Sequence, residues 1–91
     1  MMLTPIRSSR FKRDVKRLQK RGKDMAKLRD FLGLIIEQAP LPDSYRDHPL
    51  RGNWNGYRDA HIEPDWLLLY RVDGDELYLA RTGSHADLFQ R

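Results

Sequence analysis

The sequence predicts an α+β fold in which a helical hairpin packs on one face of a mainly antiparallel, four-stranded sheet. Two observations carry this prediction. Apolar residues recur at helical spacing through the first 36 positions, and three β-type runs separated by turn residues follow from position 57. The expected order is β-α-α-β-β-β. At 91 residues, we expect residues 1–91 to form a single domain.

The first two expected elements are an edge strand and a basic helix. Residues 2–7 are short and apolar, and Pro5 lacks the amide that pairing on both sides would need. Ser8 or Ser9 is a suitable N-cap, and Gly22 is a suitable stop. The helix between them has one apolar stripe, formed by Phe11, Val15 and Leu18.

A second helix is expected to begin after Asp24, whose carboxylate suits an N-cap. Its apolar face is wider than that of the first helix and consists of Met25, Leu28, Phe31, Leu32, Ile35 and Ile36. This helix should therefore lie deeper in the fold. The sequence APLP, residues 39–42, ends it, because proline cannot continue a helix and restricts the residue before it.

Three strands are expected after an irregular loop over residues 43–56. They cover residues 57–63, 66–72 and 76–82. Pro64-Asp65 forms the first turn, and Asp73-Gly74 is a strong signal for the second. Residues 83–91 have room for a single helical turn after the last strand.

The turn at Pro64-Asp65 predicts the register of the first hairpin. The expected pairs are Glu63 with Trp66, His61 with Leu68, and Asp59 with Tyr70. One face of the strand would then carry Tyr57, Asp59, His61 and Glu63, and the other Arg58, Ala60 and Ile62. Because the helices must cover the apolar face, we expect the polar face to remain open and to hold a site.

Charge is distributed unevenly along the chain. The net charge is +4, but residues 7–29 hold eleven basic and two acidic side chains, so this segment alone carries +9 and the rest −5. Such asymmetry favours a polyanionic partner or an acidic protein partner. A pair of solvated basic helices without a partner explains the charge equally well.

The composition also restricts the cellular setting. There is no cysteine, which excludes disulfides and thiolate metal sites. No apolar run reaches the roughly 18 residues of a membrane span, and the first residues lack the apolar core of a secretory signal. We therefore expect a cytoplasmic protein with no membrane association.

Ionisable side chains that could take part in catalysis lie in the second half of the chain: His48, His61, Asp65, Arg81 and His85. Asp65, Arg81 and His85 should be neighbours at one end of the sheet, with His48 entering from the loop. Imidazoles, a carboxylate and a guanidinium can cleave RNA without a metal, by removing the proton of a 2′-OH, protonating the leaving oxygen and stabilising the charge on phosphorus. Trp66 and Phe89 could stack on unpaired bases.

Each of these residues also has a structural interpretation. A histidine in a small domain is commonly a surface or hydrogen-bonded residue, Asp65 can be a turn former, and Trp66 and Phe89 can be core residues. A metal site built from His48, His61, Asp65 and His85 is a weaker alternative, because the spacing matches no helical metal-binding motif.

Three stretches resemble a known family: YRDHPLRGNW (45–54), GYRDAHIEPDWLLLY (56–70) and RTGSHADLF (81–89). Residues 13–28 match more weakly, so the similarity covers nearly the whole chain. The chain resembles YafQ-type mRNA interferase toxins of the RelE-like (RelE/ParE) superfamily, from bacterial type II toxin–antitoxin systems. The resemblance implies a microbial-ribonuclease-like α+β fold and ribosome-dependent cleavage of translated mRNA in the decoding A site.

The resemblance also implies roles for particular residues. The family's catalytic positions fall on His48, His61, Asp65 and His85, and its substrate-binding arginine and terminal aromatic fall on Arg81 and Phe89. We assign His85 as general acid and His48 or Asp65 as general base. His61 and Arg81 would stabilise the phosphate, with Asp59 in support.

The implied partners are an antitoxin, of the DinJ/RelB-like kind, and the 70S ribosome with its 16S rRNA and A-site mRNA. No cofactor or metal is expected. Two other functions remain open at this point: a non-catalytic module that binds the ribosome or an antitoxin, and a metal-dependent nuclease.

Overall fold

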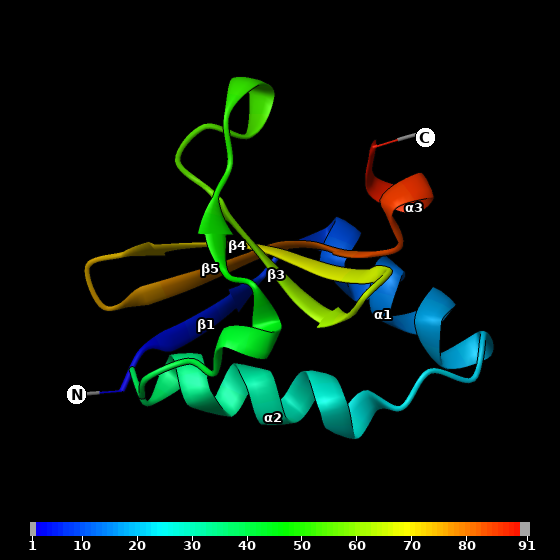
Figure 1. The fold of residues 1–91 in the computed structure, drawn as a ribbon, viewed down its shortest axis with the longest axis horizontal. Helices are drawn as coiled ribbons and strands as arrows, with labels where there is room; N and C mark the ends of the chain where they lie inside the picture. Colours follow the sequence, from blue (N-terminus) through cyan, green and yellow to red (C-terminus); the bar gives the residue numbers. More distant parts are fainter. Residues whose placement is uncertain (1, 90–91) are drawn as a thin grey trace.

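A five-stranded sheet forms the centre of the computed structural model, which describes residues 2–89 (Figure 1). The strands in chain order are β1 (Thr4–Arg7), β2 (His48–Pro49), β3 (Arg58–Glu63), β4 (Trp66–Asp73) and β5 (Glu76–Gly83). Their spatial order is β1-β5-β4-β3-β2, and only the β1–β5 pair is parallel. The predicted α+β class is confirmed. The two-residue β2 is an addition, because it lies in the segment expected to be loop.

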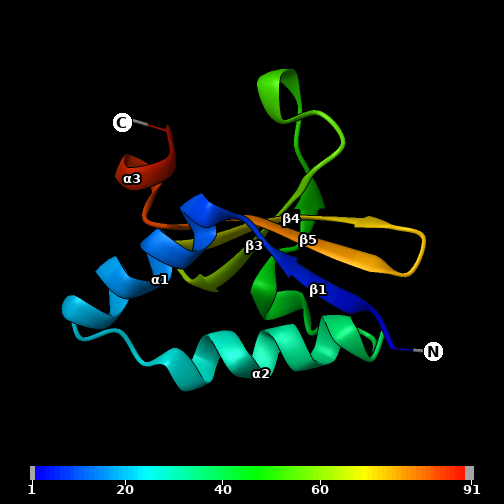
Figure 2. The ribbon, with the colours of Figure 1, turned by 180° about the vertical axis from the view of Figure 1, so that it is seen from behind.

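Two helices lie on the same side of the sheet, α1 (Ser9–Lys20) and α2 (Met25–Ile36) (Figures 1 and 2). The Ser8 hydroxyl accepts the Phe11 amide at 2.9 Å, and the Asp24 carboxylate accepts the Ala26 amide at 3.0 Å. Both predicted caps are therefore present. None of the helices within residues 2–89 is long and apolar enough to cross a membrane.

The main hydrophobic core lies between these helices and the sheet. The helices contribute Phe11, Leu18, Leu28, Phe31 and Ile35, and the sheet contributes Ala60, Trp66, Leu68, Tyr70, Leu77 and Leu79. Trp66 is fully buried, and its indole Nε1 donates to Thr82 Oγ1 at 2.9 Å. The prediction that Trp66 stacks on an RNA base is wrong for this conformation, since neither face of the ring is accessible.

The opposite face of the sheet carries a smaller apolar cluster. Leu67, Leu69 and Leu88 are buried there, with Leu50, Trp54, Ala80 and Phe89 packed against them. Two segments rise from this face (Figures 1 and 2). One is the connection between β2 and β3, which contains the 3₁₀ turn η2 (Gly52–Trp54), and the other is α3 (His85–Phe89).

The register of the β3–β4 hairpin departs from the prediction by one residue. Glu63 pairs with Trp66 as expected, but His61 pairs with Leu67 and Asp59 with Leu69, because the ladder is irregular between His61 and Glu63. An extra residue in one strand turns the following side chains to the other face. Glu63 accordingly leaves the face of His61 and binds two lysines on the helical side, Lys23 at 2.9 Å and Lys27 at 2.8 Å.

Candidate active site

The three histidines, distant in sequence, lie in a row on the open face of the sheet. His48 comes from β2, His61 from β3 and His85 from the first position of α3. The ring centroids of His48 and His61 are 6.2 Å apart, and those of His61 and His85 are 5.9 Å apart. The Phe89 ring continues the row, 6.5 Å from His85. We call His48, His61 and His85 the histidine row.

Strand β2 explains how His48 joins the row. Its pairing with β3 sets His48 opposite Asp59, two positions before His61. The preceding residue, Asp47, anchors this strand, because its carboxylate accepts hydrogen bonds from the Tyr70 hydroxyl and the Arg58 guanidinium. Burial of Tyr70 and its bond to Asp47 raise the pKa of that phenol, so it remains a donor at neutral pH.

The contacts of His48 determine which ring nitrogen carries the proton. Nδ1 lies 2.7 Å from the Arg46 carbonyl oxygen, which can only accept, so Nδ1 must be the donor. In the neutral ring Nε2 is then unprotonated and can accept a proton. Arg46 itself has a left-handed backbone, with φ of 49°, which is uncommon for a non-glycine residue.

Asp65 and His85 are neighbours, as predicted, and Asp65 holds the His85 ring in place. Both the backbone amide and ring Nδ1 of His85 donate to Asp65 Oδ1, at 2.8 and 2.6 Å. These bonds lower the pKa of Asp65, so its carboxylate is ionised and accepts from Nδ1. When the ring is protonated, its Nε2–H is the proton available for transfer.

Asp59 lies beneath the row and is only 5% exposed. Its Oδ2 is 3.7 Å from His48 Nε2. Burial raises the pKa of Asp59, and the nearby histidines, His61 first, oppose that shift. Asp59 Oδ1 and His61 Nδ1 are buried and have no hydrogen-bond partner within residues 2–89. An acidic group therefore sits where it can favour the charged forms of the imidazoles.

Arg81 is bound by Asp14, a residue of α1 that the sequence did not predict as its partner. Its Nε donates to Asp14 Oδ2 at 2.7 Å and its Nη2 to Asp14 Oδ1 at 3.0 Å, and the Thr82 amide donates to the same carboxylate. Both Arg81 and Asp14 are buried. The bond to Asp14 raises the pKa of Arg81, which keeps the guanidinium charged. Asp14 was not among the predicted site residues, although an acid three residues after Phe11, on the apolar stripe of the helix, is a usable signal.

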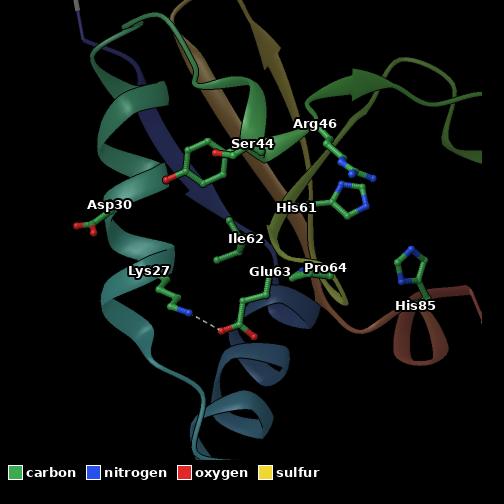
Figure 3. Close-up of a pocket in the computed structure, with 10 residues that line it drawn as sticks. Lys27, Asp30, Ser44, Arg46, His61, Ile62, Glu63, Pro64 and His85 are labelled. Atoms are coloured by element: carbon green, nitrogen blue, oxygen red, sulfur yellow. Dashed lines mark hydrogen bonds and ion pairs between the residues drawn. The ribbon is translucent and has the colours of Figure 1, made fainter.

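Two hollows lie beside α3, and each is lined in part by its residues. The first, of about 780 Å³, is lined by His61 and His85 together with Arg46, Ser44 and the Lys27–Glu63 pair (Figure 3). The second, of about 500 Å³, is lined by Phe89, Trp54 and four arginines: Arg10, Arg17, Arg51 and Arg81. Aromatic and cationic walls of this kind suit a nucleotide and its phosphate.

The family profile described as "Bacterial toxin of type II toxin-antitoxin system, YafQ" matches residues 3–90. The chain belongs to the YafQ family. The mRNA interferase toxin YafQ of Escherichia coli K12 is 53% identical over 83 residues, which are 90% of each chain. The predicted family is confirmed.

Solved structures of YafQ relatives have the same fold. The E. coli DinJ–YafQ toxin–antitoxin complex contains a chain that matches with a TM-score of 0.89 and 49% identity, over 98% of this chain and 99% of that one. A metal-bound toxin from Helicobacter pylori matches with a TM-score of 0.91 and 40% identity, over 97% of this chain and all of that one. Within residues 2–89 of this YafQ-family chain, no group of three histidine or acidic residues is arranged to hold a metal.

Proposed function

We propose that this YafQ-family toxin is an endoribonuclease that cleaves translated mRNA in the ribosomal A site by metal-free acid–base catalysis. The observation that carries the proposal is the histidine row. His48 and His85 each use Nδ1 in a fixed hydrogen bond, so each has Nε2 left for proton transfer. The name of the E. coli relative, an mRNA interferase toxin, supports the same substrate class.

His48 is the better general base of the two assigned above. Its Nε2 is unprotonated in the neutral ring and would take the proton of a ribose 2′-OH. Asp65 is a poorer base, because its Oδ1 already accepts two bonds from His85, which lower the pKa of the carboxylate. We therefore assign Asp65 to orienting His85.

The cleavage step is an internal phosphoryl transfer. The 2′-oxygen forms a bond to phosphorus as the bond from phosphorus to the 5′-oxygen breaks, and protonated His85 donates its Nε2 proton to that 5′-oxygen. The products are a 2′,3′-cyclic phosphate and a 5′-OH. After the step, His48 holds the proton of the 2′-OH and His85 is neutral, because its own proton is now on the 5′-oxygen.

Charge that develops on the phosphate needs a nearby cation. His61 lies between the other two rings, about 6 Å from each, so when protonated it would face the reacting phosphate. Asp59 supports the protonated form from below. Arg81 is held by Asp14 at the wall of the second hollow, where it would contact a neighbouring phosphate beside Phe89.

We assign the basic helix α1 to partner binding. Arg13, Lys16 and Lys20 are exposed on it, and such a surface suits the phosphates of 16S rRNA, with affinity that falls as salt rises. The same surface would accept an acidic antitoxin segment. The E. coli relative was solved in complex with DinJ, which supports a DinJ-like antitoxin for this cytoplasmic toxin.

The first experiment adds purified toxin to programmed 70S ribosomes that carry a defined mRNA. Cutting at a fixed position within the A-site codon, lost in His85→Ala, would support the proposal. Ribosome binding without cutting across varied codons would instead favour a non-catalytic binding module.

The metal-bound H. pylori relative makes a chelator test worthwhile. Excess EDTA is added to preformed toxin–ribosome complexes whose ribosomes are shown to stay intact. Metal-free catalysis predicts an unchanged cleavage rate. Loss of cleavage that is restored by one particular metal would replace the proposal with metal-dependent chemistry.

A further inference from the structure

A bidentate ion pair between Arg21 and Asp87 joins the C-terminal end of α1 to α3. Arg21 Nη1 donates to Asp87 Oδ2 at 2.6 Å, and Nη2 donates to Oδ1 at 2.9 Å. The Asp87 side chain is 12% exposed, and its bond to Arg21 holds the pKa of the carboxyl well below its usual range. Because guanidinium and carboxylate meet in parallel, the pair fixes orientation as well as distance.

Asp87 also closes the first turn of α3. Its Oδ2 accepts the Ser84 amide at 3.0 Å, while its own amide donates to Ser84 Oγ at 3.1 Å. This reciprocal pair is a capping box, which fixes how a chain enters a helix. Gly83 packs against the same side chain, since a Cβ at this glycine would lie 2.9 Å from Asp87 Oδ2. One carboxylate therefore joins α1, the end of β5 and α3.

Helix α3 depends on such contacts for its direction. It has five residues, too few to be stable as an isolated helix. Its first residue, His85, is held on one side by Asp65. Two further attachments are the buried side chain of Leu88 and the Asp87 carboxylate, which is bound to Arg21 and lies 3.8 Å from Arg17 Nη1. The last residue, Phe89, extends toward the second hollow.

We propose that the Arg21–Asp87 pair positions α3 so that His85 takes its place beside His61 in the histidine row. Both residues act through the backbone of α3, so they are positioning residues and not catalytic ones. The inference rests on the proposed function only for the role of His85. It gives Arg21 a role distinct from the partner binding proposed for Arg13, Lys16 and Lys20, which are exposed on α1.

The activity test compares Arg21→Gln and Asp87→Asn with Arg29→Gln. Arg29 is an exposed arginine of α2 that takes no part in the pair, so its variant removes the same charge and leaves the pair in place. Cleavage is measured in single turnover at rising ribosome concentration. We expect the rate at saturation to fall roughly ten-fold in the two pair variants, because misplacement of a catalytic group by less than 1 Å is costly. Arg29→Gln should leave the saturated rate at the wild-type value.

Two further variants separate positioning from general damage. Asp87→Glu keeps both the charge and a favoured capping side chain, and should recover most of the saturated rate. The double variant Arg21→Gln/Asp87→Asn should be no slower than the slower single variant, because each change breaks the same pair. An Arg21→Gln that matches Arg29→Gln, with its saturated rate intact, would overturn the proposal.

Amide hydrogen exchange provides a test that needs no cleavage. The His85 amide donates to Asp65 and the Leu88 amide to the Ser84 carbonyl. Both should exchange at least several-fold faster in Arg21→Gln and Asp87→Asn than in wild type or Arg29→Gln. Unchanged exchange would overturn the positioning role. If the wild-type toxin did not cut mRNA, the proposed function would be wrong. Amide exchange would still test whether the Arg21–Asp87 pair positions α3.

Discussion

The helical face and the open face of the sheet carry different kinds of side chain. On the helical face, α1 and α2 cover large apolar side chains, and the buried set includes Phe31 and Trp66, both fully inaccessible. On the open face, the smaller cluster of Leu67, Leu69 and Leu88 lies beneath the histidine row. Stability should therefore reside mainly on the helical face and chemistry on the open one. Substitutions on the two faces should then give opposite patterns of effect.

The largest effect expected from the open face is on rate. His48→Gln removes the proposed base, and we expect single-turnover cleavage to slow by about 10² to 10⁴-fold. The His48 side chain is half exposed, so the free energy of unfolding should change by no more than about 0.5 kcal/mol. Cleavage assays and denaturant unfolding measure the two quantities. A strongly destabilised protein with nearly normal cleavage would break the contrast between the faces.

The matching effect on the helical face is on stability. Trp66→Ala should lower the free energy of unfolding by about 3 to 5 kcal/mol, because it leaves a large cavity. Trp66→Phe keeps most of the volume and should retain cleavage. Denaturant unfolding and single-turnover assays on both variants test this. Loss of cleavage by a well-folded Trp66→Phe would restore the stacking role that burial argues against.

Asp14 belongs to α1 but binds Arg81, which lines the second hollow. Substitution of Asp14 should therefore affect both stability and cleavage. Asp14→Asn leaves the buried Arg81 guanidinium without its counter-charge, and should cost about 3 kcal/mol of unfolding free energy. The double variant Asp14→Leu/Arg81→Met removes both charges and should recover much of that loss. It should still cleave slowly, because the second hollow has lost a cation. Full recovery of cleavage in the double variant would show that Arg81 is purely structural.

The smallest expected effect concerns pH and Asp59. A carboxyl whose pKa is raised by folding contributes stability that is present at low pH and lost as pH rises through the raised value. Asp59→Asn should therefore unfold at higher denaturant than wild type at neutral pH, with the difference fading below about pH 4. Cleavage should fall in the same variant, since the imidazoles lose a negative neighbour. Greater acid sensitivity of the variant would reverse the sign and refute this account.

Much of the helical face was predictable from the sequence because it follows repeating rules. Helical spacing placed Phe11 and Leu18 in the core, and the capping residues Ser8 and Asp24 set the helix starts. The class of fold and the Asp65–His85 contact were also predictable, the latter because a turn and the end of a neighbouring strand meet at one edge of the sheet.

The open face was harder to predict because single local irregularities decide it. The irregularity after His61 shifts the register by one residue and places Glu63 beside the lysines. A periodic sequence pattern does not predict such an irregularity. The two-residue strand β2 is too short to have a sequence signal, yet it brings His48 beside Asp59. Asp14 was missed because it lies among eleven basic residues and reads as a solvated charge.

The parallel pairing of β1 with β5 has a consequence for how the chain acquires its activity. Thr4 pairs with Glu76, so the first strand to be synthesised has no neighbour until β5 has been made. The β4–β5 hairpin needs only local contacts and can form quickly, whereas β1 must close a loop of almost the whole chain. The helices are likewise made before the strands on which they pack. A ribosome that is synthesising this toxin therefore carries a nascent chain without an assembled histidine row until its last strand and α3 have been made.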